Sequence, residues 1–266
     1  MAYTYKHVIL VGIDGAGNFY KNTKAPAIRK LFEEGAGTDY CLTSLPSISA
    51  ECWGSMLIGV PPTVHGLTNE IVEREKYKNS DHPSIFKLIR ESRPEASLAS
   101  FCNWVPINLG IIEEGLGVYQ DCGDDDRLTT KICAYIKENK PDFLFVQFDS
   151  IDGAGHTYGY GTERYLEELT KADGYVGSIR AAVEEAGIAD DTLFIATADH
   201  GGFGQSHGGD TDGEKYVFFA AVGKTVTPGS KIDLEVKDIP AIVARALGVK
   251  GADNWDAKVP DGLFSE

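Results

Sequence analysis

Short, almost wholly apolar runs alternate along this chain with segments whose apolar residues recur at helical spacing. The apolar runs are rich in β-branched and aromatic residues, as expected for strands that are covered on both faces. They span residues 7–13, 96–102, 143–148, 192–198 and 216–222. The helical segments span residues 26–35, 84–90, 126–138, 166–186 and 238–247. This alternation predicts an α/β fold, a three-layer αβα sandwich around a mostly parallel sheet.

Length and charge limit what such a protein can do. At 266 residues the chain can bury one large core, and no repeat or linker divides it, so we expect a single domain spanning residues 1–266. The formal net charge of −15 argues against binding to nucleic acid polymers or to anionic membranes.

Cysteine content and hydropathy indicate the cellular compartment in which the protein is expected to function. The five cysteines are odd in number and form no CxxC pair, which is typical of free thiols in a reducing compartment. The first apolar run is too short for a secretory signal, and no stretch is long enough to span a membrane. We therefore expect a cytoplasmic protein without a membrane anchor.

Three of the predicted strands are followed directly by carboxylates. Asp14 follows residues 7–13, Asp149 and Asp152 follow residues 143–148, and Asp199 follows residues 192–198. A single aspartate in such a place more often shapes a turn or caps a helix. Because ligands of parallel sheets bind outside the carboxyl ends of the strands, we expect the three groups to meet at one rim.

Three of the six histidines lie in short, glycine-rich stretches that contain these acids. They are His156, four residues after Asp152, His200, directly after Asp199, and His207. Mixed carboxylate and imidazole ligands suit zinc, with manganese or iron as alternatives. Two nearby ions would clamp the attacking and leaving oxygens of an in-line displacement. The set predicts a site for two divalent ions, although each motif alone is also compatible with an ordinary loop.

A nucleophile for such a displacement is available at the start of a predicted helix. Residues 46–59 resemble a loop that enters a helix at Ser49. A serine there commonly caps the helix with its side chain. The same position would suit a nucleophile, because a nearby ion favours the alkoxide and a helix N-terminus attracts phosphate. The residues alone leave both roles open.

The order of these motifs resembles that of the alkaline phosphatase superfamily, and within it the nucleotide pyrophosphatase/phosphodiesterase branch. As in that branch, Ser49 precedes Gly59 by ten residues, and His65-Gly66 follows Gly59 by six. Pro62 also fits the pattern. The resemblance therefore selects Ser49 over the neighbouring serines and covers nearly the whole chain.

The resemblance implies a two-metal hydrolase of phosphate esters, an enzyme that works through a covalent phosphoserine intermediate. It implies an alkaline phosphatase-like fold and a small-molecule phosphate ester as substrate. It also implies two ligand sets, one made of Asp152, His156 and His207, and the other made of Asp14, Asp199, His200 and the Ser49 hydroxyl.

The chain also departs from the pattern. Glu51 and Cys52 occupy the positions where the branch has Pro and Asn, so we expect different contacts with the substrate. The Asp-Ser-Ala triplet with its adjacent arginine, typical of alkaline phosphatases, is absent. A sulfatase is disfavoured because neither Cys41 nor Ser49 is followed by the arginine that formylglycine formation requires. A phosphomonoesterase, a phosphonate hydrolase and a non-catalytic metal-binding relative remain as alternatives.

Overall fold

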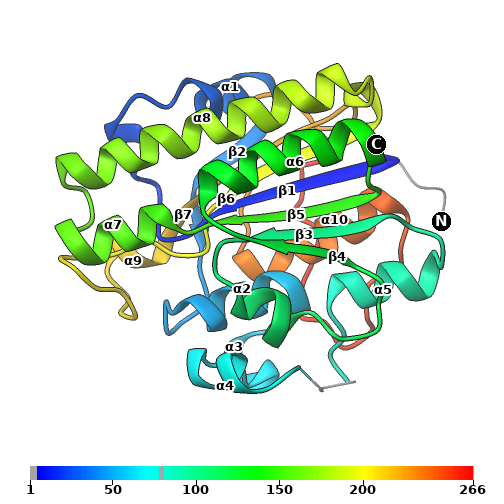
Figure 1. Cartoon of the computed structure of the whole chain (residues 1–266), viewed down its shortest axis with the longest axis horizontal. Helices are drawn as coiled ribbons and strands as arrows, with labels where there is room; N and C mark the ends of the chain where they lie inside the picture. The colour runs from blue at the N-terminus through cyan, green and yellow to red at the C-terminus, as the bar shows by residue number, and fades with distance from the viewer. Residues whose placement is uncertain (1–4, 78–80, 266) are drawn as a thin grey trace.

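One seven-stranded sheet forms the middle of the molecule, with the strand order β2-β7-β6-β1-β5-β3-β4. The computed structural model describes residues 5–77 and 81–265 (Figure 1). The strands are β1 (His7–Ile13), β2 (Ala36–Leu42), β3 (Leu98–Cys102), β4 (Tyr119–Cys122), β5 (Phe143–Phe148), β6 (Thr192–Thr197) and β7 (Tyr216–Val222).

Helices cover both faces of this sheet. They are α1 (Pro26–Glu34), α2 (Ser49–Ile58), α3 (Pro62–His65), α4 (Asn69–Arg74), α5 (Ile85–Ser92), α6 (Asp125–Asn139), α7 (Ser150–Tyr158), α8 (Glu163–Glu185), α9 (Asp212–Lys215) and α10 (Ile239–Leu247). Helices α1, α6 and α8 pack over one face, and α2, α5 and α10 pack over the other (Figure 1). The predicted three-layer αβα sandwich is confirmed.

The sheet is mostly parallel, as the apolar runs predict. Strand β1 lies at the centre and pairs in parallel with β5 on one side and β6 on the other. Strand β7 is the exception, because it runs antiparallel to both β6 and β2. Strands β1, β5 and β6 are buried along nearly their whole length, which explains their continuous apolar sequences.

The two edge strands, β2 and β4, are absent from the sequence-based prediction. Strand β2 exposes Tyr40 and Leu42, and β4 has exposed or half-buried residues throughout. An edge strand that faces solvent needs no continuous apolar run, so its sequence carries little signal. No helix in the described part of the chain is both long and apolar enough to cross a bilayer.

Helix α2 approaches the central strand unusually closely. Trp53 of α2 is fully buried, and its ring packs edge-on against Phe145 of β5, with 5.6 Å between the centroids. A Cβ atom on Gly12 of β1 would stand 2.3 Å from Cη2 of Trp53. Glycine at this position therefore lets the helix and its indole ring lie against the sheet.

We predict that Gly12→Ala lowers the free energy of unfolding by about 1–3 kcal/mol, the usual cost of overpacking. The matched control is Gly174→Ala in α8, where nothing lies within 4 Å of the added Cβ. That variant should gain about 1 kcal/mol from helix propensity. Urea unfolding of both variants checks the signs, and a Gly12→Ala protein as stable as the parent would contradict the close approach.

Candidate active site

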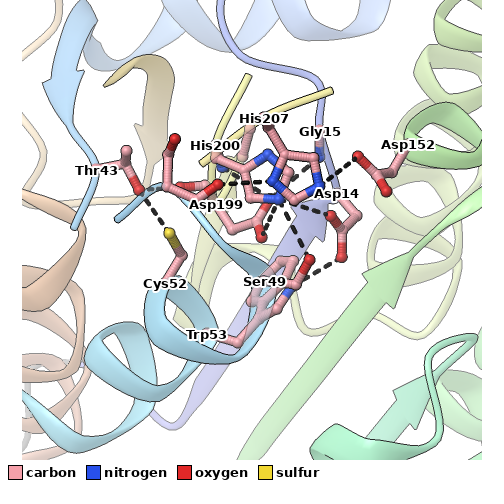
Figure 2. Close-up of polar contacts among 12 residues, drawn as sticks. Asp14, Gly15, Thr43, Ser49, Cys52, Trp53, Asp152, Asp199, His200 and His207 are labelled. Carbon is pink, nitrogen blue, oxygen red and sulfur yellow. Dashed lines mark hydrogen bonds and ion pairs between the residues drawn. The ribbon is translucent and has the colours of Figure 1, made fainter. Parts of the chain in front are cut away.

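The acids that follow the strands lie together at one rim of the sheet. Asp14 follows β1, Asp199 follows β6, and Asp152 lies on α7, which follows β5 (Figure 2). Because β6, β1 and β5 are adjacent and parallel, their carboxyl ends deliver all three side chains to the same place. The structure also places His156, His200, His207 and Ser49 at this rim.

Asp14, Asp199 and His200 form a fully buried triad, which we call the inner triad. Nε2 of His200 lies 3.4 Å from Oδ1 of Asp14 and 3.4 Å from Oδ2 of Asp199. Nδ1 of His200 lies 2.8 Å from the carbonyl oxygen of Gly201, so the ring donates there and turns its Nε2 lone pair toward the carboxylates.

Each carboxylate of the inner triad has one satisfied oxygen and one unsatisfied oxygen. Oδ2 of Asp14 accepts hydrogen bonds from Trp53 Nε1 at 2.8 Å and from Gln147 Nε2 at 2.9 Å. Oδ1 of Asp199 accepts from the backbone N–H groups of Gly15 and His200. Oδ1 of Asp14 and Oδ2 of Asp199 are buried without a hydrogen-bond partner. Such orphaned acceptors beside an imidazole lone pair are the donor set that a divalent cation requires.

The pKa shifts of the three inner-triad residues also indicate that the site lacks compensating positive charge. Burial, followed by repulsion from Asp199, raises the pKa of Asp14 well above its usual value. Burial likewise raises the pKa of Asp199 and lowers the pKa of His200. All three pKa shifts favour the neutral forms of these side chains, so the protein alone does not stabilise two ionised carboxylates here. A bound cation would favour the ionised carboxylates instead.

A second group, the outer triad, consists of Asp152, His156 and His207. Nε2 of His156 lies 3.2 Å from Oδ2 of Asp152 and 3.1 Å from Nε2 of His207. Their Nδ1 atoms lie 2.9 and 2.7 Å from the carbonyl oxygens of Gln205 and Ser47. With both Nδ1 atoms donating to carbonyls, two Nε2 lone pairs face each other, which is unfavourable unless a cation or a proton lies between them.

The two triads touch through their histidines. The rings of His200 and His207 are stacked, with 3.9 Å between their centroids (Figure 2). The outer triad is the more exposed one, since the side chain of His156 is 46% exposed whereas that of His200 is fully buried. The two triads are therefore adjacent groups of candidate metal ligands, one deep and one shallow.

The capping role considered for Ser49 is wrong. Ser49 is the first residue of α2, the N-cap is Ile48, and no side chain of these residues caps the helix. Instead, Oδ1 of Asn69 in α4 accepts a hydrogen bond from the Ala50 N–H at 2.9 Å. This leaves the Ser49 hydroxyl free, and its Oγ lies 3.3 Å from Nε2 of His200 (Figure 2).

The two residues that depart from the branch pattern do not join the triads. Cys52 is buried and accepts a hydrogen bond from Thr43 Oγ1 at 3.1 Å, and Thr43 Oγ1 also contacts the carbonyl oxygen of Asp199. Burial raises the pKa of the Cys52 thiol well above its usual value. Glu51 is also buried, and burial raises its pKa. Through its hydrogen bond with Thr43, the neutral Cys52 thiol helps to hold the loop before α2 in place.

Four residues that support the site are missing from the sequence-based prediction, namely Trp53, Asn69, Gln147 and Tyr160. Gln147 could have been found, because it is the one polar residue in the apolar run 143–148. Its buried amide accepts from the Trp104 N–H at 2.8 Å and donates to both Asp14 and Asp149. The other three carry no such signal, because none of them interrupts an apolar run or belongs to one of the metal-ligand motifs identified in the sequence.

Positive side chains are absent from both triads. Among residues 5–77 and 81–265, no lysine or arginine forms an ion pair with any member of either triad. Any neutralising charge must therefore come from bound ions or protons.

Comparisons with known proteins identify the family of this chain. Residues 8–211 match the family described as Type I phosphodiesterase / nucleotide pyrophosphatase. No curated protein sequence was matched.

Solved structures share the fold at low sequence identity. Murine ectonucleotide pyrophosphatase/phosphodiesterase 5 is 12% identical with a TM-score of 0.80, over 97% of this chain and 100% of that chain. An inactive variant of it in complex with AMP is 11% identical with a TM-score of 0.79, over 95% of this chain and 97% of that chain. A 2-O GAG sulfatase is 13% identical with a TM-score of 0.77, over 96% of this chain and 73% of that chain. By its family match and its fold, the chain belongs to the type I phosphodiesterase/nucleotide pyrophosphatase family of the alkaline phosphatase superfamily.

Proposed function

We propose that this protein hydrolyses phosphate diesters, with Ser49 as the nucleophile and two divalent cations held by the inner and outer triads. One observation carries the proposal: a helix-terminal hydroxyl, free of any capping role, lies 3.3 Å from the histidine of a triad whose carboxylates have orphaned oxygens. Family membership gives the reaction class independent support.

The residues present fit a pair of divalent ions. Asp14, Asp199 and His200, together with the Ser49 hydroxyl, would hold one ion, and the outer triad would hold the other. Carboxylate and imidazole donors favour zinc, with manganese or iron as alternatives. When bound, the ions would supply Lewis-acid charge that favours the serine alkoxide and stabilises the leaving oxygen.

The chain's own groups define the covalent steps. Ser49 Oγ attacks phosphorus in line, so the Oγ–P bond forms as the bond to the leaving oxygen breaks, and the proton that Oγ gives up is balanced by the one that the leaving alkoxide takes up to depart as an alcohol. Water then attacks the phosphoserine ester, which still carries the second alcohol group; the Oγ–P bond breaks, one proton of the water returns to Ser49 Oγ, and a phosphate monoester is released. The N-terminus of α2 would favour the negative phosphoryl group, as helix N-termini do for other anions. The amide of Asn69, fixed beside Ala50, is the candidate for a further contact with these oxygens.

Charge favours diesters over monoesters. A phosphate monoester carries up to two negative charges at neutral pH, whereas a diester carries one. No basic side chain pairs with either triad in the described chain, and the protein has a formal net charge of −15. The substrate's charge must therefore be met by the ions alone, which suits the singly charged ester. The AMP complex of the murine relative makes nucleotide-linked diesters the first natural candidates.

We expect zinc- or manganese-loaded protein to cleave bis(p-nitrophenyl) phosphate with a kcat/KM at least about tenfold above that for p-nitrophenyl phosphate, a difference of about 1.4 kcal/mol in transition-state stabilisation. Exhaustive chelation should abolish both activities, and added metal should restore them. A preference for the monoester would favour a phosphomonoesterase. Cleavage of a phosphonate with neither ester turned over would favour a phosphonate hydrolase.

Ser49→Ala should lower kcat by about 10³-fold or more, because it removes the attacking atom. The bound metal, measured by elemental analysis, should be largely retained, since the carboxylates and imidazoles remain. Ser55→Ala is the matched control, because Ser55 lies on the same helix and contacts His65 instead of the triad. Full activity in Ser49→Ala would remove the nucleophile from the proposal, and a chain that binds metal without any turnover in the parent would be a binding protein.

Asp14→Asn should stabilise the metal-free protein at neutral pH. A raised folded-state pKa means that the Asp14 contribution to stability is present at low pH and is lost as pH rises through that pKa. The neutral amide avoids this loss and can still accept from Trp53 and Gln147. We expect its melting temperature to exceed that of the metal-free parent by at least about 2 °C, with the difference shrinking toward pH 4.

The same thermal scans contain their own controls. Zinc should raise the melting temperature of the parent more than that of Asp14→Asn, because the variant lacks a ligand. Asp191→Asn should give no stabilisation, since Lys224 and Lys6 lower the pKa of Asp191 to about 2. A metal-free Asp14→Asn protein that melts below the parent at neutral pH would contradict the proposed charge balance.

A further inference from the structure

Within the described residues, Tyr160 is the only tyrosine whose side chain forms a hydrogen bond with a residue of either triad. Its hydroxyl donates to Oδ1 of Asp152 in the outer triad. We propose that Tyr160 is a positioning residue that holds Asp152 as a one-oxygen ligand and thereby sets the affinity of the shallow ion site. This inference rests on the two-ion function proposed above.

The Tyr160 ring is locked in place by glycines of two separate segments. A Cβ on Gly155 of α7 would stand 2.5 Å from the ring, and one on Gly202 would stand 2.4 Å from it. The ring also packs against His156 and Tyr165, with centroid distances of 5.9 and 5.4 Å. Such tight enclosure fixes where the hydroxyl can point.

Because the Tyr160 hydroxyl is fixed, the two carboxylate oxygens of Asp152 have different surroundings. Oδ1 is enclosed, because it accepts from Tyr160 and a Cβ on Gly15 would stand 2.5 Å from it. Oδ2 lies 3.2 Å from Nε2 of His156, and within the described residues no hydrogen bond from another side chain reaches it. Oδ2 is therefore the oxygen left for a cation, and a neutral phenol orients the carboxylate without cancelling its charge.

Tyr160 also reaches the second ligand of the outer triad through the backbone. Its N–H donates to the carbonyl oxygen of Gly204 at 2.8 Å. Gly204 lies in the tight turn between Phe203 and Ser206, whose Gln205 carbonyl holds Nδ1 of His156. Tyr160 thus positions Asp152 directly and His156 through this turn. Both belong to the outer triad, which is more exposed than the inner triad and so is less constrained by surrounding packing.

The experiment isolates the outer triad and removes one hydroxyl. In an Asp14→Asn background, which weakens the inner triad by one ligand, the tighter zinc-binding event in a calorimetric titration should report Asp152, His156 and His207. Adding Tyr160→Phe keeps the ring and removes the donor, and we expect the zinc affinity to fall by about 10- to 100-fold. The visible absorption bands of bound Co²⁺ should change as well, because they report the coordination geometry.

Tyr20→Phe in the same background is the matched control. Tyr20 is also a buried tyrosine whose hydroxyl donates to an aspartate, Asp39, at 2.7 Å, but both lie outside the triads. It should leave zinc affinity and the Co²⁺ spectrum unchanged. A general loss of packing would affect both variants, whereas a positioning role affects Tyr160→Phe alone.

The outcomes separate this inference from the function it rests on. If neither the parent nor Asp14→Asn binds zinc, the two-ion function fails. If Asp14→Asn binds zinc and Tyr160→Phe binds it equally tightly with an unchanged Co²⁺ spectrum, the role of Tyr160 is overturned and the function stands. Should Tyr160→Phe not fold, Gly155→Ala replaces it, because its methyl group displaces the ring. Undiminished zinc affinity in that variant would likewise overturn the inference.

Discussion

Repulsion among buried carboxylates is the constraint on which this site depends. Asp14, Asp152 and Asp199 converge at the rim of the central strands, and no lysine or arginine of the described chain pairs with them. Burial without compensation drives such groups toward their neutral forms. The protein supplies only neutral donors, from indole, amide, phenol and backbone N–H groups. These donors orient the carboxylates but add no positive charge, so a cation bound here would favour their ionised forms.

The same separation of roles appears around Ser49, the proposed nucleophile. Helix α2 needs an acceptor at its N-terminus, and a serine in that position would ordinarily provide it. Here Asn69 provides it from another helix, so the Ser49 hydroxyl faces the inner triad. Cys52, one turn along α2, is held by the loop that precedes the helix. The orientation of the nucleophile is therefore built by segments on both sides of it in the sequence.

The sequence predicts the central strands and the converging acids because their cause is local. A strand buried on both faces must be apolar, and the parallel order of β6, β1 and β5 brings the residues after them to one rim. The edge strands β2 and β4 have no such requirement and leave no apolar pattern. The supporting contacts of Trp53, Asn69 and Tyr160 depend on packing between distant segments, which periodicity and spacing do not encode. Gln147 is the intermediate case, because a lone amide in a buried strand signals a partner without saying which one.

The reversed direction of β7 determines how the chain can be elaborated. After β6 the chain does not leave the rim through a crossover helix, as it must between parallel neighbours, but returns into β7 by way of residues 199–215. That single connection carries His200, the turn that holds His156, and His207. It can lengthen or shorten at its exposed turn without disturbing the pairing of any strand. Substrate-binding segments of different lengths can therefore be added in this one loop while the two triads keep their positions, which gives proteins of this fold a simple way to vary their substrates.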